Sequence, residues 1–162
     1  MGLPAAPAPL DLRAGHDDLA ATGMAKKPST LKISRDEKRN LDVEIGFIEG
    51  VVRRDPDFLE ALQILGDDYT RRGRLDDGLK IDEQLARLRP EDPTVLYNLA
   101  CSYSLLGHTD AAFAAIDRAL LAGYKDFKWM TQDPDLELLR KHPGFEQVRA
   151  KMKAVKAKGK TA

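Results

Sequence analysis

The 162-residue sequence is poor in several residue types that particular classes of protein need. It contains one cysteine, Cys101, which excludes an internal disulfide framework and a cysteine-based zinc site. Aromatic residues make up 6% of the chain, so a core has to rely on Leu, Ile, Val and Ala. No run of about 18 apolar residues occurs, and we expect no membrane-spanning segment. Strict alternation of apolar and polar residues is also lacking, which argues against a β-sheet protein.

The sequence likewise lacks the patterns that mark catalytic or metal-binding sites. His16, His108 and His142 lie far apart, and none has a second histidine at helical spacing. Neither a glycine-rich phosphate loop nor a Gly-x-Ser-x-Gly motif occurs. We interpret Asp67 and Asp68 as solvated helix residues, because adjacent side chains diverge on a helix surface. We therefore predict that the protein is not an enzyme and has no catalytic, cofactor-binding or metal-binding residues.

The start of the chain also lacks the features of a signal peptide. It has no early positive charge, and Pro4, Pro7 and Pro9 interrupt its apolar run. We expect the cytoplasm as the location. Residues 1–33 are rich in Ala, Pro and Gly and are predicted to form a disordered arm. Met24 offers an alternative translation start within that arm.

What the sequence does contain is an internal repeat with a step of 34, which predicts a repeat architecture. The matched positions are mostly apolar or turn residues, the kinds that a packed pair of helices constrains. The pairs are Pro56 with Pro90, Leu62 with Leu96, Leu65 with Leu99, Tyr69 with Tyr103, Gly73 with Gly107 and Asp76 with Asp110. The repeat predicts two helix-turn-helix units, over residues 57–90 and 91–124.

Local signals place the helix ends within these units. Gly73 suits the left-handed residue that closes a helix, and a second helix is predicted over 75–88. In the next unit, Asp92 is a predicted N-cap with Pro93 in the first turn. Thr109 or Asp110 is predicted to cap the following helix. Small residues recur where helices should cross closely, with Gly66 matched by Ala100 and Gly78 by Ala112.

These residues resemble the tetratricopeptide repeat family over about residues 40–124. The first unit carries the pattern as Leu62, Leu65-Gly66, Tyr69, Gly73, Gly78, Leu85 and Pro90, and the second as Leu96 to Ala100, Tyr103, Gly107, Ala112 and Ala119. The resemblance implies an all-α fold, a short right-handed α-solenoid of helix-turn-helix repeats with helical caps. The sequence departs from the family pattern at Leu62 and Leu96, where the family often has Trp. It departs again at Asp82, where the family prefers a large apolar residue.

Terminal elements are expected to cover the ends of such an array, within a repeat domain spanning residues 34–155. A capping helix is predicted over 34–54, because Ser34 and Glu37 form a capping-box pattern before an apolar stripe. The stripe consists of Leu41, Ile45, Ile48 and Val52. A C-terminal cap is predicted over 125–155, with Leu136, Leu139, Phe145, Val148 and Met152 covering the last unit.

Charge is balanced overall, with 26 basic and 26 acidic residues, but it is unevenly placed. Residues 40–139 carry eleven basic and twenty acidic residues, whereas residues 140–162 carry eight and one. An acidic body therefore precedes a basic end, and residues 156–162 are predicted to be a disordered basic tail. The tail offers an alternative function as a ribosome- or nucleic-acid-associated factor. It lacks the aromatic residues that stack on bases, so nucleic acid is not the partner that we expect.

The resemblance implies a non-catalytic scaffold or adaptor whose concave groove holds a peptide or helix of another protein. Asn98 matches one position of the family's carboxylate clamp, but Gln63 and Asp67 do not supply its other groups, so we expect a neutral or basic segment instead. Self-association through an exposed terminal helix is a second kind of partner that we leave open. Carried over by register, the groove residues are Gln63, Asp67, Thr70, Tyr97, Asn98, Cys101, Ser104 and Leu105.

Overall fold

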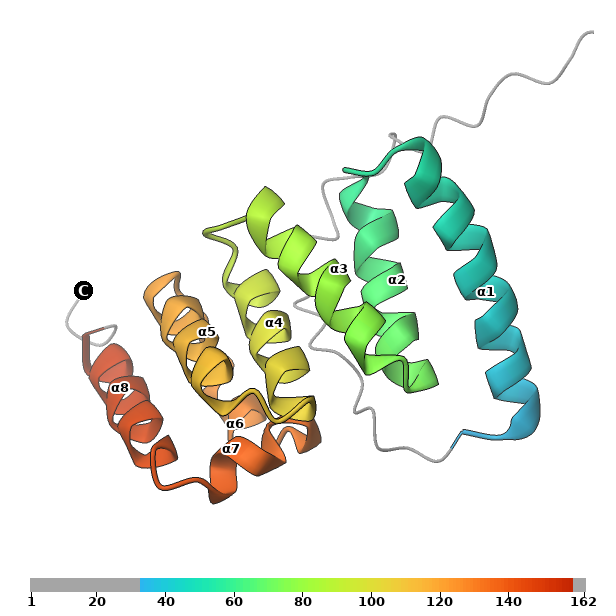
Figure 1. Cartoon of the computed structure of the whole chain (residues 1–162). Coiled ribbons are helices and arrows are strands. Elements are labelled where there is room, and N and C mark those ends of the chain that lie inside the picture. Colours follow the sequence, from blue (N-terminus) through green and yellow to red (C-terminus); the bar gives the residue numbers. More distant parts are fainter. Residues whose placement is uncertain (1–32, 159–162) are drawn as a thin grey trace, which may run out of the picture.

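The computed structural model describes residues 33–158, whose regular elements are all helices joined by turns, with no strand among them (Figure 1). Predictions for residues 1–32 and 159–162, including the arm and Met24, lie outside the described residues. Consecutive helices pack in chain order from α1 at one end of the array to α8 at the other (Figure 1). The elements are α1 (Arg35–Arg54), α2 (Leu59–Arg72), α3 (Leu75–Leu88), α4 (Pro93–Leu105), α5 (Thr109–Leu121), α6 (Phe127–Met130), the 3-10 helix η2 (Pro134–Leu136), α7 (Glu137–Lys141) and α8 (Phe145–Lys158).

The first helix begins at the predicted capping box. The Glu37 backbone amide donates to Ser34 Oγ at 3.2 Å, and the Ser34 amide donates to Glu37 Oε2 at 2.7 Å. Two amides that a helix start leaves without partners are thereby satisfied. Leu41 and Ile45 from the predicted stripe are buried, and the other two stripe residues are partly buried.

The predicted close crossing between α2 and α3 is confirmed at two glycines. A Cβ atom on Gly78 would lie 3.0 Å from Thr70 Oγ1, and one on Gly66 would lie 3.2 Å from Ile81 Cγ2. Larger side chains at these positions would force the helices apart. Gly73 follows α2 with φ of +85°, the left-handed conformation predicted for it, and α3 has the predicted bounds.

The start of α4 is as predicted, and the start of α5 is not. Asp92 Oδ1 accepts from two first-turn amides, and Pro93 is the first helical residue. The predicted cap of α5 at Thr109 or Asp110 is wrong, because His108 is the cap residue and its side chain accepts no bond. The His108 backbone already closes the preceding helix by donating to the carbonyl of residue 103, so the new helix begins one residue earlier than expected.

A third helical pair follows, and its first member is broken into α6, η2 and α7. The five predicted covering residues, Leu136, Leu139, Phe145, Val148 and Met152, are buried. Helix α8 continues to Lys158, so the tail prediction from residue 156 onward is wrong in its first residues. Val155 is partly buried, and the Lys156 ammonium lies 5.2 Å from the centre of the Phe127 ring, which ties this last turn to α6.

The core runs continuously from α2 to α8, and a smaller cluster of Ile45, Leu65 and Tyr69 joins α1 to α2. Asp82, the departure from the apolar pattern, is 2% exposed and accepts a hydrogen bond from the Ser102 hydroxyl. The bond supplies the buried carboxylate with the partner that burial demands. None of the helices between residues 33 and 158 combines the length and apolar character needed to cross a bilayer.

Candidate partner-binding surface

The interfaces between successive units are built from the same hydrogen bond, repeated at the step of 34. The Tyr69 hydroxyl donates to Glu49 Oε1 at 2.7 Å between α2 and α1. The Tyr103 hydroxyl donates to Glu83 Oε1 at 2.9 Å between α4 and α3. Our sequence reasoning used the tyrosines and missed the acids, although Glu49 and Glu83 also match at a step of 34. Helix α1 therefore stands to α2 as α3 stands to α4.

Both tyrosines are held as neutral donors. Burial raises the pKa of Tyr69 to about 12, with a further contribution from its bond to the negatively charged Glu49. Burial also raises the pKa of Tyr103, again with help from its acidic partner, Glu83. The hydroxyls consequently keep their protons, and the bonds persist, throughout the neutral range.

A second contact also repeats and secures the turn between units. The Gln84 side-chain amide donates to the Pro56 carbonyl at 2.8 Å, and the Arg118 guanidinium donates to the Pro90 carbonyl at 3.5 Å. The two donors are separated by one repeat step, and so are the two acceptors. The two prolines match across the repeat, and nothing in that match indicated that their carbonyls are acceptors.

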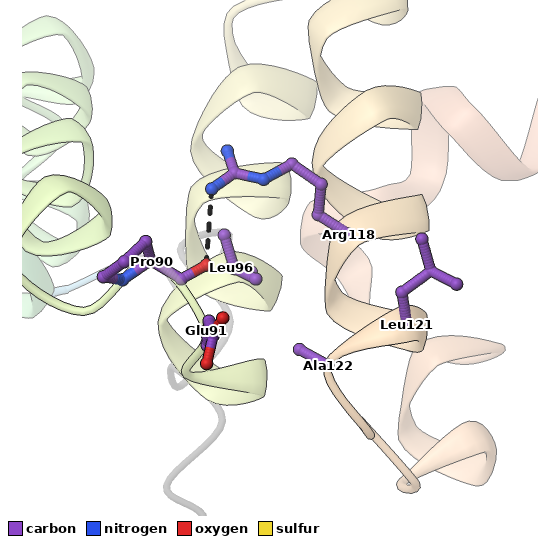
Figure 2. A pocket seen from close by; sticks show the side chains of 6 residues that line it. All are labelled: Pro90, Glu91, Leu96, Arg118, Leu121 and Ala122. Carbon is purple, nitrogen blue, oxygen red and sulfur yellow. Dashed lines mark hydrogen bonds between the residues drawn. The ribbon is translucent and has the colours of Figure 1, made fainter.

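The second of these contacts borders a depression of about 410 Å³ (Figure 2). At this place the second unit has Ala122, one repeat step after Leu88. The smaller alanine side chain does not fill the space, and the depression results. Arg118 points across the opening toward Pro90 and is already engaged with its carbonyl (Figure 2). The hollow is a variation on the repeat contact, and we assign no ligand to it. Its lining is Pro90, Glu91, Leu96, Arg118, Leu121 and Ala122.

Three predicted groove residues on α4 are buried by the chain itself. Tyr97, Cys101 and Ser104 are 0%, 1% and 1% exposed. The segment forming η2 and α7 packs against α4, and Asp133 at its start contacts Tyr97 and Cys101. The Tyr97 hydroxyl donates to Asp133 Oδ2 at 2.6 Å, and its ring stacks on Tyr124 at 4.2 Å between centroids. The structure corrects the prediction at these three positions, since their side chains are not accessible to a partner.

Asp133 is the centre of that internal contact. Its Oδ2 also lies 3.7 Å from Cys101 Sγ, its Oδ1 accepts from the Asp135 amide at 3.0 Å, and its carbonyl accepts from Arg140. Burial, reinforced by Cys101 and Asp133, raises the pKa of Tyr97 well above its usual range. Asp133 is also the N-cap residue of η2. Its bond to Tyr97 has no counterpart one repeat step away, so no repeated spacing could indicate it.

The first unit leaves more of its predicted surface accessible. Gln63 is exposed and Asp67 is partly exposed on α2. Thr70 is 2% exposed, and its hydroxyl donates to the Gly66 carbonyl at 3.0 Å, so the prediction that it faces a partner is wrong. On α4, two predicted residues, Asn98 and Leu105, remain partly exposed. The accessible part of the predicted site is Gln63, Asp67, Asn98 and Leu105.

The α1–α2 side of this surface is acidic. Asp68 is 2% exposed, which corrects the expectation of a solvated residue, and it pairs with Arg71 at 3.3 Å. Burial, together with the negative charges of Glu44 and Asp67, raises the pKa of Asp68 to about 6 against the opposing charge of Arg71. Three carboxyl groups therefore lie close enough to affect one another electrostatically. Among residues 33–158, no group of three or more His, Cys, Asp or Glu side chains is arranged to hold a metal ion.

Comparison with known proteins gives distant similarity over part of the chain. No protein-family model matches the chain. It is 37% identical over 101 residues to a chloroplastic protein of Arabidopsis thaliana, a match that covers 60% of this chain and 29% of that protein. It is 31% identical over 91 residues to the peroxisomal targeting signal receptor of Komagataella phaffii, covering 55% and 16%. The receptor of the same name from Candida albicans is 33% identical over 76 residues, covering 47% and 13%. The chain thus spans less than a third of the length of each of these curated relatives.

Proposed function

We propose that this chain is a tetratricopeptide repeat protein that acts as a non-catalytic scaffold or adaptor, holding a segment of another protein. The repeat step of 34, the helical pairs packed in chain order and the repeated tyrosine–glutamate bonds support the proposed architecture. The similarity to proteins named as receptors of a targeting signal supports a protein as the partner. The cytoplasm is the compartment that we propose.

The observation that carries the proposal is the accessible row on the first helix of each unit. Gln63 and Asp67 on α2 keep exposed surface, as do Asn98 and Leu105 on α4, while the helices that carry them are fixed by buried contacts. A surface that is ordered before binding loses little conformational freedom when a partner docks. The partner contributes the segment, and the helices provide a fixed template for it.

The charges of this surface favour a neutral or basic segment. Asp67 and Glu44 both lie close enough to Asp68 to raise its pKa, so an incoming carboxylate would be repelled and a lysine or arginine attracted. Asn98 is partly exposed with its Oδ1 buried, so its amide nitrogen is the group that it offers as a donor to an extended backbone. The proposed partner segment is therefore one with basic side chains that faces α2.

The alternative function through the basic C-terminal end has less support from the packing. Lys151 Nζ lies 2.5 Å from Asp117 Oδ2, and Lys156 lies over the Phe127 ring. Both lysines thus contact other parts of this chain and offer less positive charge to phosphates. We keep the alternative as an outcome of the test and do not propose it as a second function.

The test is a peptide-display selection against the full chain, followed by measured affinities of the selected peptides. We expect basic peptides, whose affinity falls about tenfold or more with Asp67→Lys and less with Asn98→Ala. The matched control is Glu91→Lys, a reversal of the same sign on an exposed acid beside the Figure 2 depression, and it should change little.

Two results would contradict the proposal. Equal losses with Asp67→Lys and Glu91→Lys would show an unspecific charge effect, and selection of acidic peptides would remove the assigned chemistry. Binding of nucleic acid that is lost on charge removal at Lys153 would move the function to the C-terminal alternative.

A further inference from the structure

Helix α1 presents an apolar face that no other part of residues 33–158 covers. Val43 and Phe47, at positions i and i+4, are each 71% exposed. Gly46 and Gly50 lie on the same side of the helix, and a Cβ atom on either would meet nothing within 4 Å. Glycine weakens a helix interior, so two glycines that no contact within residues 33–158 requires point to the approach of another helix.

The same face is covered in the later units. Phe47 precedes Ile81 by one repeat step and Ala115 by two. Ile81 Cγ2 would touch a Cβ atom at Gly66 on α2, and Ala115 is 3% exposed. In α3 and α5 this position therefore packs inward, whereas α1 leaves it open. Within residues 33–158, the face of α1 therefore lacks the packed helix that covers the matching position in α3 and α5.

The charged residues at the two ends of this face make it self-complementary. Asp36, Val43, Phe47 and Arg54 follow one another at steps of seven, four and seven, a spacing that reads the same in both directions. All four lie within a narrow arc of the helix, because steps of seven and four are close to whole turns. Asp36 is exposed and pairs with Arg39 at 3.8 Å on the solvated surface. Such an exposed ion pair contributes little to stability, so Asp36 can give up Arg39 for another basic partner.

We propose that this face binds a second copy of the chain through an antiparallel pairing of the two α1 helices. A two-fold axis that passes this face at the level of residue 45 along the helix sets Val43 of each copy against the other copy's Phe47. The same axis sets Asp36 of each copy against the other copy's Arg54, so both ends carry opposite charges. Gly46 and Gly50 let the two backbones approach. The interface is isologous, with one patch used twice, and its small extent makes the dimer a weak one.

Charge symmetry is the reason for choosing a second copy over the other occupants. An antiparallel copy sets Asp36 at one end of the face against Arg54 at the other end, since the face is its own complement. The segment that precedes Ile33 could cover the face as well, and so could another protein. A substitution in α1 changes the charges of a second copy as well, but it leaves the charges of these two other occupants unchanged. Charge substitutions in α1 can therefore separate the three occupants.

The experiment is sedimentation velocity on the full chain over a concentration series, with far-UV circular dichroism as a check on folding. We expect a concentration-dependent monomer–dimer equilibrium that weakens as salt is added. Phe47→Glu should weaken dimerisation by about tenfold or more. The matched control is Leu121→Glu, a leucine that is 89% exposed on α5, and this variant should dimerise like the parent.

Charge exchange then identifies the occupant. Asp36→Arg and Arg54→Asp should each weaken the dimer, and the double variant should recover it, because both new charges meet their opposites in the second copy. A parent chain that stays monomeric at its highest soluble concentration overturns the proposal. The proposal is also overturned if the double variant dimerises no better than the two single losses of affinity multiplied together would give. It is overturned as well if Leu121→Glu weakens dimerisation as much as Phe47→Glu does.

Discussion

The first helices of the two units, α2 and α4, hold matching positions in the repeat and meet different surroundings. At one such position α2 has the exposed Gln63 and α4 has the fully buried Tyr97. The difference arises from the neighbouring elements, because α4 is covered by η2 and α7. A repeat register thus assigns a direction to a side chain, and the neighbouring element decides whether that direction leads to solvent or to the core.

The largest expected effect is a test of this difference at matched positions. Tyr97→Ala should lower the free energy of unfolding by about 3–5 kcal/mol, because it leaves a cavity and removes the hydroxyl from the buried Asp133. Gln63→Ala should change it by less than about 0.5 kcal/mol. Chemical denaturation of both variants measures the two values. Similar losses would mean that the two helices are equally covered in solution.

The next comparison sets the covered face of α3 against the bare face of α1. Gly78→Val should destabilise the chain by about 1–3 kcal/mol, because a Cβ at this site already lies 3.0 Å from Thr70 Oγ1. Gly46→Val, with nothing within 4 Å of its Cβ, should be neutral or slightly stabilising. Thermal unfolding at low protein concentration compares them. A large loss from Gly46→Val would show that the α1 face is covered within the monomer.

A smaller effect concerns the acidic side of α2. The pKa of Asp68 in the folded chain is about 6, above its ordinary value of 3.8, so folding favours the protonated form. The stabilising contribution of the protonated form is present below about pH 4 and is lost as the pH rises through 6. Asp68→Asn should therefore raise the free energy of unfolding at pH 7 by about 1–2 kcal/mol and flatten its pH profile between 4 and 7.

The measurement for Asp68 is denaturant unfolding at several pH values. The exposed Asp76→Asn is its control and should keep the slope of the parent protein. An Asp68→Asn profile as steep as that of the parent would assign the pH dependence to other groups. A loss of stability at pH 7 would show that the pairing with Arg71 outweighs the cost of burial.

The smallest effect tests whether the two unit interfaces are equivalent. Tyr69→Phe and Tyr103→Phe each remove one hydroxyl from a glutamate and should each cost about 0.5–1.5 kcal/mol. The double variant should show the sum, because the sites lie in different interfaces. Equilibrium unfolding of the three variants checks this. Single costs that differ by more than about 1 kcal/mol would break the equivalence of the interfaces.

The helical elements could be predicted where each depends on its own residues. The Ser34 capping box, the turn at Gly73 and the crossing at Gly78 are local or repeated features, and all of them occur as expected. The α5 cap was missed because Gly107 and His108 close the previous helix and leave Thr109 free to become helical. Choosing between adjacent cap residues requires turn geometry that spacing alone does not specify.

The candidate site was less predictable, because exposure depends on contacts distant in sequence. Tyr97 and Cys101 have the register of groove residues and are covered by a segment that lies well beyond them in the chain. That segment departs from the repeat at Asp133, so the step of 34 could not position it. Where contacts do repeat, as with Glu49 and Glu83, they could have been predicted. Matching acidic residues at the step of 34 would have identified these two glutamates.

The tyrosine–glutamate bond also bears on how such a chain changes length during evolution. The stretch 57–90 contains Tyr69, which bonds backward to Glu49, and Glu83, which bonds forward to Tyr103. A tandem duplication of this stretch would present its new tyrosine to an existing glutamate and its new glutamate to an existing tyrosine. Whole units could therefore be gained or lost by recombination without new interface chemistry, and each event would lengthen or shorten the array by one helical pair.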